Sequence, residues 1–375
     1  MNLEEYAAKA ALLGPAGIPI PRSRVCGTAE EAVDAVADLG SAVIKAQVPS
    51  GKRGKSGGIR FADRPATAFD VARAILGMRI GEYRVERLLV EERCEIAREL
   101  YASVLIDVDA RQPVVLFSME GGMDIEEVAE RNPGAIRRHF VEPSRGFNAS
   151  DAASLLAACD LGKSKEAVAD VLVRLYRVFR EHDSDLIEIN PLAMLEDGRV
   201  LALDCKFVLD DASVSRQAEL VAVAAPPRKT ALEARGETIG LKFIQLDGNV
   251  GVLANGAGLT MTTMDAVHHF GGRPANFLEI GGEAYTKAEA ALDLVLSNPG
   301  VKSLAIIFCG AFARTDVMAE GVVRAWETLK PKVPVFFSIH GTGEEEAVKL
   351  VRERLGIEPF DKMEDAVKAA VEAAR

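Results

Sequence analysis

A glycine-rich, basic loop follows an apolar segment in the first half of the sequence. Residues 45–58 read KAQVPSGKRGKSGG; after Lys45 come four glycines that would let a ligand approach the backbone and three cations that suit a polyphosphate. The loop is not a Walker A motif, because Gly51 and Gly54 enclose only two residues where that motif needs four. Lys45 lies in the apolar segment and, if buried, needs an anionic partner. This favours phosphate binding over the alternative, a flexible loop with solvated charges.

A second polar group occupies a predicted hairpin, residues 186–195 and 200–209. If its loop is Glu196-Asp197-Gly198, Asn190 pairs with Asp204, Glu188 pairs with Lys206, and all four side chains share one face. Cβ atoms of opposed residues lie about 4.5–5.5 Å apart, so two oxygen donors could hold one Mg²⁺ together with water and phosphate oxygens. The alternative is a half-solvated hairpin with a cross-strand Glu–Lys ion pair.

The elements around these groups mix strands and helices irregularly in the first half. Residues 221–238 contain an AAPPRK stretch and polar residues, and we expect a linker there. The predicted helices are residues 3–13, 29–39 and 163–182, and the predicted strands besides the hairpin are residues 42–48, 88–91, 101–107 and 114–119.

The second half repeats one pattern four times: an apolar strand, a glycine turn and a helix. Such a repeat predicts a parallel, doubly wound sheet with right-handed crossovers, and ligands of such sheets bind at the carboxyl ends of the strands. The predicted strands are residues 250–254, 276–280, 301–308 and 333–339, followed by turns at 255–258, 281–282, 309–310 and 340–343.

The composition limits the classes of function. A chain of 375 residues predicts two or three packed units, and a formal net charge of −11 argues against nucleic acid or an anionic membrane as partner. Five scattered cysteines without a Cys-x-x-Cys pair argue against a disulfide framework and a thiolate zinc site. No apolar run reaches the roughly 18 residues of a membrane span, and the acidic N-terminus is no signal peptide. We therefore expect a cytoplasmic protein.

Several longer stretches resemble the β subunits of succinyl-CoA synthetases. They include GKRGKSGG at 51–58, IARELY at 96–101, EGGMDIEEVAE at 120–130, DLIEINPL at 185–192, LDGNVG at 246–251 and NGAGL at 255–259. The resemblance covers nearly the whole chain in order. It implies a fold of the α/β and α+β classes, with an N-terminal ATP-grasp domain in residues 1–225 and a flavodoxin-like, doubly wound CoA-ligase domain in residues 240–375.

The resemblance also implies roles for individual residues. Lys45 and the loop would hold the ATP phosphates, Asn190 and Asp204 would bind Mg²⁺ in agreement with the hairpin argument, and catalytic Glu188 would face a phosphohistidine. The implied nucleotide-binding residues are Lys45, Gly51, Lys52, Arg53, Gly54, Lys55, Glu91 and Cys94 at the adenine end, and Glu99; the implied substrate-binding residues are Asn255, Gly310, Ala311, Phe312 and Arg314.

The implied reaction has three steps: ATP phosphorylates a carboxylate, the acyl phosphate phosphorylates a histidine, and the acyl group passes to CoA. The family carries that histidine and most of the CoA site on an α subunit, so this chain alone would be inactive. Of its own histidines, only His340, on a predicted glycine turn, is a candidate for substrate contact.

The sequence departs from the family pattern in the turns that would bind the acid. Residues 280–286 read IGGEAYT, and the turn within residues 308–316, FCGAFARTD, is one residue longer than usual. The acid therefore stays open among succinate, malate, itaconate and other dicarboxylates, as does the choice of ATP or GTP. Two other hypotheses are an ATP-grasp enzyme that joins a carboxylate to an amine and a non-catalytic nucleotide-binding paralogue.

Overall fold

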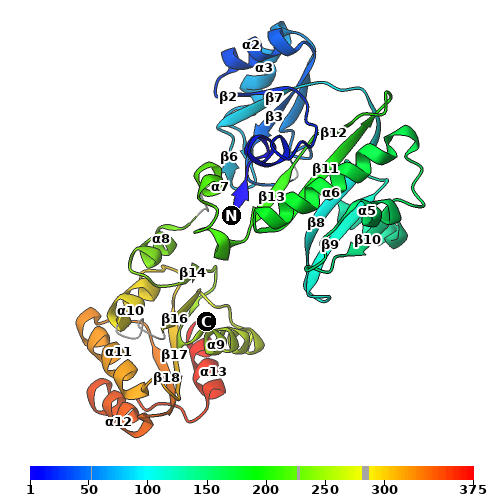
Figure 1. Cartoon of the computed structure of the whole chain (residues 1–375). Coiled ribbons are helices and arrows are strands. Elements are labelled where there is room, and N and C mark those ends of the chain that lie inside the picture. The colour runs from blue at the N-terminus through cyan, green and yellow to red at the C-terminus, as the bar shows by residue number, and fades with distance from the viewer. Residues whose placement is uncertain (52, 226–228, 281–286) are drawn as a thin grey trace. The chain divides into compact units, whose positions relative to one another are not determined.

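The computed structural model describes residues 1–51, 53–225, 229–280 and 287–375 (Figure 1). The chain forms two compact units, residues 1–227 and 228–375. Within the described residues, no helix is long and apolar enough to cross a membrane.

The first unit contains two antiparallel sheets. In the larger sheet, the order is β1 (Asn2–Leu3), β13 (Lys206–Leu209), β11 (Ser184–Leu195), β8 (Ile96–Asp107), β9 (Gln112–Ser118) and β10 (Ile136–Phe140), and β12 (Val200–Ala202) pairs with β11. In the smaller sheet, the order is β2 (Ser23–Cys26), β7 (Arg87–Glu92), β3 (Ala42–Gln47) and β4 (Ile59–Ala62); β5 (Arg79–Ile80) and β6 (Tyr83–Arg84) form a separate ribbon.

Helices cover these sheets because their apolar residues recur at helical spacing. In α6 (Lys165–Glu181), Val168, Leu172, Leu175 and Phe179 form one buried stripe, and the helix packs on β8 and β11. The other helices of this unit are α1 (Glu5–Ala8), continued by a π-helical turn (Lys9–Leu13), α2 (Ala29–Leu39), α3 (Pro65–Ile75), α4 (Ile125–Arg131), α5 (Ala149–Leu155) and α7 (Ala218–Val223), with 3₁₀ turns at Pro133–Ala135, Gly162–Ser164 and Asp211–Ser213.

The second unit is built on one sheet in the order β14 (Phe243–Gln245), β16 (Asn276–Ile280), β15 (Val250–Asn255), β17 (Ser303–Gly310) and β18 (Val335–Gly341). All neighbours run parallel except β14. The four parallel strands lie in the spatial order second, first, third, fourth, so the winding direction reverses between β15 and β17. The prediction of a flavodoxin-like, doubly wound sheet is confirmed.

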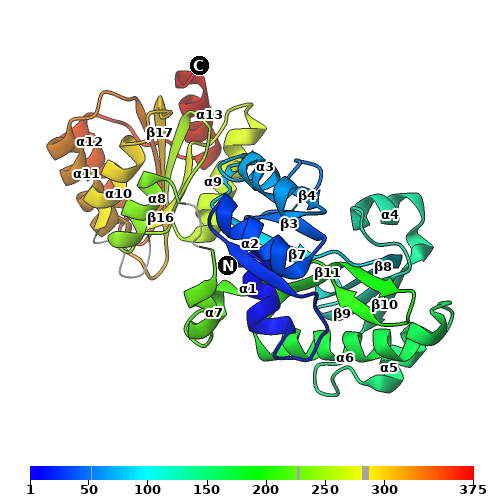
Figure 2. The same ribbon diagram turned by 90° about the horizontal axis from the view of Figure 1, so that it is seen from above.

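Two separate apolar cores lie on the two faces of this sheet. Alternate residues of β17 divide between them: Leu304 and Ile306 belong to one core, Ala305 and Ile307 to the other. The helices α8 (Ala231–Thr238), α10 (Ala288–Leu296), α11 (Thr315–Leu329) and α12 (Glu344–Leu355) contribute to the first core, and α9 (Ala257–His269) and α13 (Met363–Ala373) contribute to the second (Figure 2).

The division between the two units falls within the predicted linker, residues 221–238, but helices α7 and α8 occupy much of that range. Helix α8 begins at a capping box, in which Thr230 and Glu233 exchange side-chain-to-backbone hydrogen bonds, and it packs on β14 and α10. A side chain at Gly236 would meet Phe243 Cβ at 2.9 Å, so the helix lies close to the sheet. Residues 231–238 therefore belong to the second unit.

Candidate functional site

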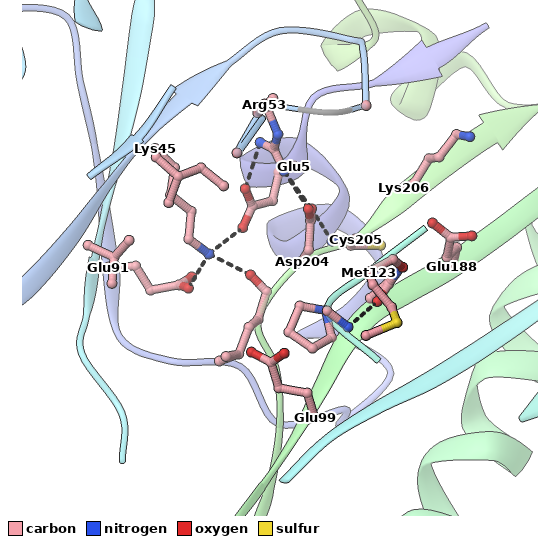
Figure 3. Close-up of a pocket in the computed structure, with 18 of the residues that line it drawn as sticks. Glu5, Lys45, Arg53, Glu91, Glu99, Met123, Glu188, Asp204, Cys205 and Lys206 are labelled. Carbon is pink, nitrogen blue, oxygen red and sulfur yellow. Dashed lines mark hydrogen bonds and ion pairs between the residues drawn. The ribbon is translucent and has the colours of Figure 1, made fainter. Parts of the chain in front are cut away.

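A cavity of about 660 Å³ lies in the first unit (Figure 3). Its walls are formed by β3, β7, the glycine-rich loop after β3, the strands β11 and β13 and the segment before α4. The cavity collects every predicted site residue of this unit except Lys52, which lies outside the described residues. Those residues are Lys45, Gly51, Arg53, Gly54, Lys55, Glu91, Cys94, Glu99, Glu188, Asn190 and Asp204.

Lys45 is buried in β3 and has the anionic partners that its burial requires. Its Nζ donates to Glu5 Oε1 at 3.0 Å, to Glu91 Oε1 at 2.6 Å and to the carbonyl of Leu203 at 2.5 Å. Burial alone would lower the pKa of Lys45, but Glu5 and Glu91 raise it above its ordinary value. Lys45 is thus a protonated cation on the wall of the cavity.

The two described loop cations are also paired with carboxylates. Arg53 is buried, and its Nη2 donates to both oxygens of Asp204 at 2.6 and 2.7 Å, while its Nη1 lies 2.7 Å from Glu5 Oε2. Exposed Lys55 contacts Asp124 at 2.5 Å and Glu127 at 3.0 Å. Lys55 therefore links the glycine-rich loop to the start of α4 through ion pairs.

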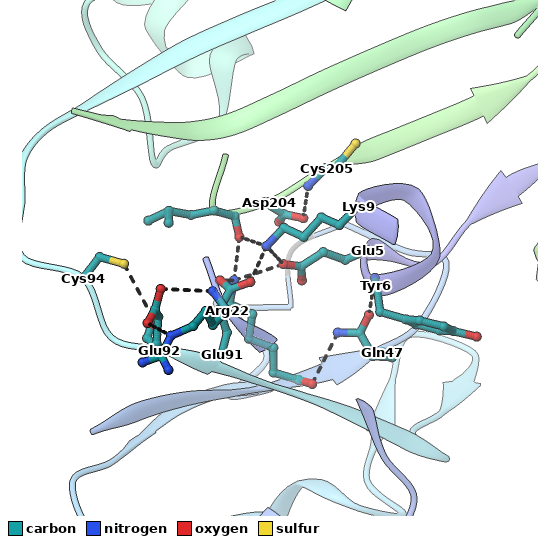
Figure 4. A network of polar contacts seen from close by, with 12 residues as sticks. Glu5, Tyr6, Lys9, Arg22, Gln47, Glu91, Glu92, Cys94, Asp204 and Cys205 are labelled. Atoms are coloured by element: carbon teal, nitrogen blue, oxygen red, sulfur yellow. Dashed lines mark hydrogen bonds and ion pairs between the residues drawn. The ribbon is translucent and has the colours of Figure 1, made fainter. Parts of the chain in front are cut away.

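Apolar side chains line another part of the cavity. They include Val43, Ile59, Phe61 and Ile96, and such a wall suits a planar base. Cys94 lies in this wall, and burial raises the pKa of its thiol. Glu91, expected at the adenine end, uses its carboxylate in ion pairs with Lys45 (Figure 3) and with Lys9 (Figure 4). Its contact with adenine stays a prediction.

A two-glycine turn before α4 lies against Glu99 and Asn190. A Cβ on Gly121 would come 2.2 Å from the carbonyl oxygen of Leu100, and a Cβ on Gly122, whose φ is +73°, would come 1.8 Å from Glu99 Oε2. The N–H of Gly122 donates to Asn190 Oδ1 at 2.7 Å, and Asn190 Nδ2 donates to the carbonyl of Met123 at 2.9 Å. The turn needs glycines and fixes the orientation of the Asn190 amide.

The predicted hairpin register is confirmed on both sides of the expected metal site but interrupted within it. Glu188 pairs with Lys206 and Leu192 with Ala202, as expected. However, β12 ends at Ala202 and β13 begins at Lys206, so Asp204 lies in a break of the ladder, and its expected direct pairing with Asn190 is not formed. The break lets the Asp204 carboxylate meet Arg53.

The donor chemistry of Asn190 and Asp204 fits Mg²⁺. Amide and carboxylate oxygens are hard ligands, and both residues line the cavity. The described residues contain no group of three or more histidine, cysteine, aspartate or glutamate side chains placed to hold a metal. Phosphate oxygens and water would have to supply the other ligands, as is usual for Mg²⁺ at nucleotide sites.

Glu188 lies in a polar corner of the same cavity. Tyr101, almost fully buried on β8, donates its hydroxyl to Glu188 Oε2 at 2.9 Å. Lys206 lies opposite Glu188 on β13 (Figure 3). Burial raises the pKa of Glu188, against the opposing effects of Tyr101 and Lys206. A carboxylate with these neighbours suits a contact with a cationic or proton-donating ring.

The predicted substrate residues lie at the carboxyl ends of β15 and β17, where the winding direction reverses. Asn255 Nδ2 donates to the carbonyl of Cys309, and the N–H of Cys309 donates back to Asn255 Oδ1, both at 2.8 Å. A Cβ on Gly310 would lie 2.0 Å from the carbonyl oxygen of Ala313, so this turn also needs glycine. Asn255 thus connects the two strand ends.

The rest of that turn projects to solvent. The Phe312 side chain is fully exposed, and Arg314 pairs with Asp316 in the first turn of α11 at 2.7 Å. Ala311 accepts a hydrogen bond from Thr342 Oγ1 at 2.8 Å. The altered turn at residues 281–286 lies outside the described residues.

His340, the one histidine singled out by sequence, has both ring nitrogens in contact with neighbouring groups. Its Nε2 lies 2.7 Å from the carbonyl oxygen of Asp361, and its Nδ1 lies 3.3 Å from Glu344.

Two residues of the cavity region, Glu5 and Lys9, escaped the sequence reasoning. Both are only 2% exposed, and they form an ion pair at 2.7 Å one helical turn apart. A signal was present, because positions 5 and 9 are in phase with the buried Leu12 and Leu13. Charged residues on the apolar stripe of a helix indicate buried partners.

Comparisons with known proteins give the class of the chain. The sequence model of the ATP-grasp domain family matches residues 2–194, and that of the CoA-ligase family matches residues 253–371. The solved ATP citrate lyase of Methanothrix soehngenii, 23% identical, has the same fold with a TM-score of 0.74 over 99% of both chains. The chain is therefore a nucleotide-binding ATP-grasp domain followed by a CoA-ligase domain.

Full-length relatives are more specific. The chain is 42% identical to the GDP-forming succinate–CoA ligase β subunit of Thermus thermophilus, over 94% of this chain and 93% of the relative. It is 40% identical to the ADP-forming β subunit of Herpetosiphon aurantiacus over the whole of both chains. The chain belongs to the family of succinate–CoA ligase β subunits, and membership implies a partner subunit.

Proposed function

We propose that this chain is the nucleotide-binding subunit of an ATP-dependent ligase that joins succinate, or a related dicarboxylate, to CoA. The main observation in support of this proposal is that three cations, Lys45, Arg53 and Lys55, line one cavity. Asn190 and Asp204 line the same cavity. Polyphosphate oxygens can replace the carboxylates that now pair with these cations. Phosphoryl transfer depends on such charge neutralisation and alignment more than on a protein base.

We assign phosphate binding and metal binding to different residues of the cavity. Lys45 and Arg53 would hold phosphate oxygens from one side, and Lys55, at the mouth, would leave Asp124 and Glu127 to close over them. Asn190 and Asp204 would hold Mg²⁺, which when bound neutralises and orients the phosphates. The glycine turn fixes the amide of Asn190, whose Oδ1 accepts from the N–H of Gly122 and would offer its second lone pair to the metal.

The second unit would bind the acid or its acyl phosphate. Asn255 and the turn over 310–312 lie where ligands of doubly wound sheets bind, and helix N-termini there favour anions. Phe312 lies in the turn that is one residue longer than is usual in the family. We therefore expect this residue to discriminate among dicarboxylates. CoA would bind mainly to the partner.

The partner would be an α subunit that carries the phosphorylated histidine. Glu188, held by Tyr101 at the cavity wall, would receive the partner's phosphohistidine and orient its ring. The isolated chain would bind nucleotide but not turn over.

The test is a reconstitution with an α subunit from the same genome. The complex is given Mg²⁺, CoA and either ATP or GTP, with succinate, malate, itaconate or no acid, and release of nucleoside diphosphate is measured. We expect turnover that requires the α subunit, CoA and one of the acids. The absence of turnover with every acid, despite nucleotide binding, would favour the non-catalytic paralogue, and amine-dependent turnover by the chain alone would favour the amine-joining ligase.

A further inference from the structure

A second lysine lies behind Lys45. Lys9, in the π-helical turn after α1, is 2% exposed, and it is not among the described residues that line the cavity, whereas Lys45 is. Lys9 Nζ donates to Glu5 Oε1 at 2.7 Å, to Glu91 Oε2 at 2.5 Å and to the carbonyl of Leu203 at 2.9 Å (Figure 4). These are the same three groups that Lys45 contacts.

The two lysines therefore share one set of acceptors but differ in access to the cavity. Glu5 also pairs with Arg53, which in turn holds Asp204. Three cations and three carboxylates form one connected network, in which Lys9, Lys45 and Arg53 pair with Glu5, Glu91 and Asp204. The three positive and three negative charges of this network balance one another.

A bound polyphosphate would change that balance. Phosphate oxygens in the cavity can reach Lys45 and Arg53 but not Lys9. When the two accessible cations turn towards phosphate, Glu5 and Glu91 would be left as buried carboxylates, which is costly unless a cation stays with them. Burial would raise the pKa of Glu5, but the surrounding cations hold it well below its ordinary value, so this residue is a carboxylate.

We propose that Lys9 is a positioning residue of the nucleotide site, the resident cation that keeps Glu5 and Glu91 neutralised while Lys45 and Arg53 engage phosphate. The proposal rests on the proposed function, because it requires a polyphosphate in this cavity. It assigns Lys9 a role that scales with the negative charge of the ligand rather than with its base or sugar.

The experiment measures Kd values of the full-length chain with Mg²⁺ for ATP, ADP, AMP and adenosine by calorimetry. Lys9→Met removes the charge but keeps the length of the side chain. We expect its Kd for ATP to rise about tenfold to a hundredfold, the range for one charge-assisted hydrogen bond, with a smaller rise for ADP and AMP and none for adenosine. Lys349→Met, which removes a surface lysine of α12, is the control and should change nothing.

The double variant Lys9→Met, Glu5→Gln keeps the proposal testable if the single variant unfolds. Removing one cation and one carboxylate restores the balance of the network, so the double variant should fold and recover most of the ATP affinity. Glu5→Gln alone frees Lys45 and Arg53 from a competing carboxylate and should bind ATP no more weakly than the unaltered chain.

The outcomes separate this proposal from the proposed function. If the unaltered chain binds none of the phosphorylated ligands, the proposed function fails. If it binds ATP and the Lys9→Met variant binds ATP equally well, or loses adenosine as much as ATP, or is not rescued by Glu5→Gln, then Lys9 has only a structural role and the inference is overturned.

Discussion

The two units hold their candidate residues in opposite ways. In the first unit, Lys45, Arg53 and Glu91 are buried, each bonded to several charged groups. In the second unit, the corresponding groups stand at strand ends: Asn255 is bonded to backbone, and Phe312 projects fully into solvent. The candidate residues of the first unit are therefore mostly buried charges paired with opposite charges, whereas those of the second unit are uncharged or exposed groups at strand ends.

This difference implies that stability and function are coupled in the first unit and separable in the second. Removing one partner of a buried ion pair leaves an uncompensated charge, whereas an exposed pair in water contributes little. The cores of the second unit are apolar on both faces of the sheet, so the turns at its strand ends can vary without disturbing them. The longer turn at residues 309–315 is consistent with such freedom.

The largest expected effect is on stability in the first unit. Glu91→Ala leaves Lys9 and Lys45 short of a carboxylate in a buried site and should lower the free energy of unfolding by about 3–5 kcal/mol. Glu358→Ala, which breaks an exposed bidentate pair with Arg352 in the second unit, should cause no measurable change. Urea denaturation followed by circular dichroism compares them, and equal effects would contradict the distinction between the units.

A smaller effect is expected on the pH dependence of turnover. The Tyr101 hydroxyl stabilises the charged form of Glu188 and so lowers a pKa that burial has raised. Tyr101→Phe should raise the pKa of Glu188 further and move the acid limb of the kcat/KM profile to higher pH, with little change well above that limb. Tyr176→Phe, in the aromatic cluster with Phe147 and Phe179, is the control. An acid limb that does not move would show that Glu188 is not the titrating group.

The smallest effect on the fold is expected at the exposed turn of the second unit. Phe312→Ala removes a fully exposed side chain, so the unfolding transition should stay where it is. If Phe312 helps to select the acid, the KM for the acid should change in the reconstituted ligase while the KM for nucleotide stays constant. A change in the KM for nucleotide alone would place this turn outside the acid site.

Much of the fold was predictable because its signals are local. Helix 29–39 and strand 276–280 have the predicted bounds, and α6 agrees with its predicted range within two residues at the start and one at the end. Strand β8 begins at Ile96, five residues before the prediction, because residues 96–100 are polar in part and are held by pairing with β11. Such pairing depends on a partner about 90 residues away.

The candidate site was predictable as a set of residues but not as a network. The residue pattern and the family resemblance pointed to Lys45, Arg53 and Asp204. However, nothing in a linear sequence shows that Arg53 donates hydrogen bonds to both carboxylate oxygens of Asp204. The Asn190–Asp204 pairing failed because the ladder breaks at residues 203–205, a tertiary effect of the neighbouring loop. Glu5 and Lys9 went unnoticed because a charged pair one helical turn apart usually lies on the surface.

The central claim is that the cavity of the first unit binds a nucleotide together with its metal. The most direct measurement is a calorimetric titration of the full-length chain with ATP, with and without Mg²⁺, beside the Asn190→Ala, Asp204→Asn double variant. We predict one site per chain, tighter binding with Mg²⁺, and loss of that metal dependence in the variant. Equal ATP affinity in both proteins, independent of Mg²⁺, would contradict the account.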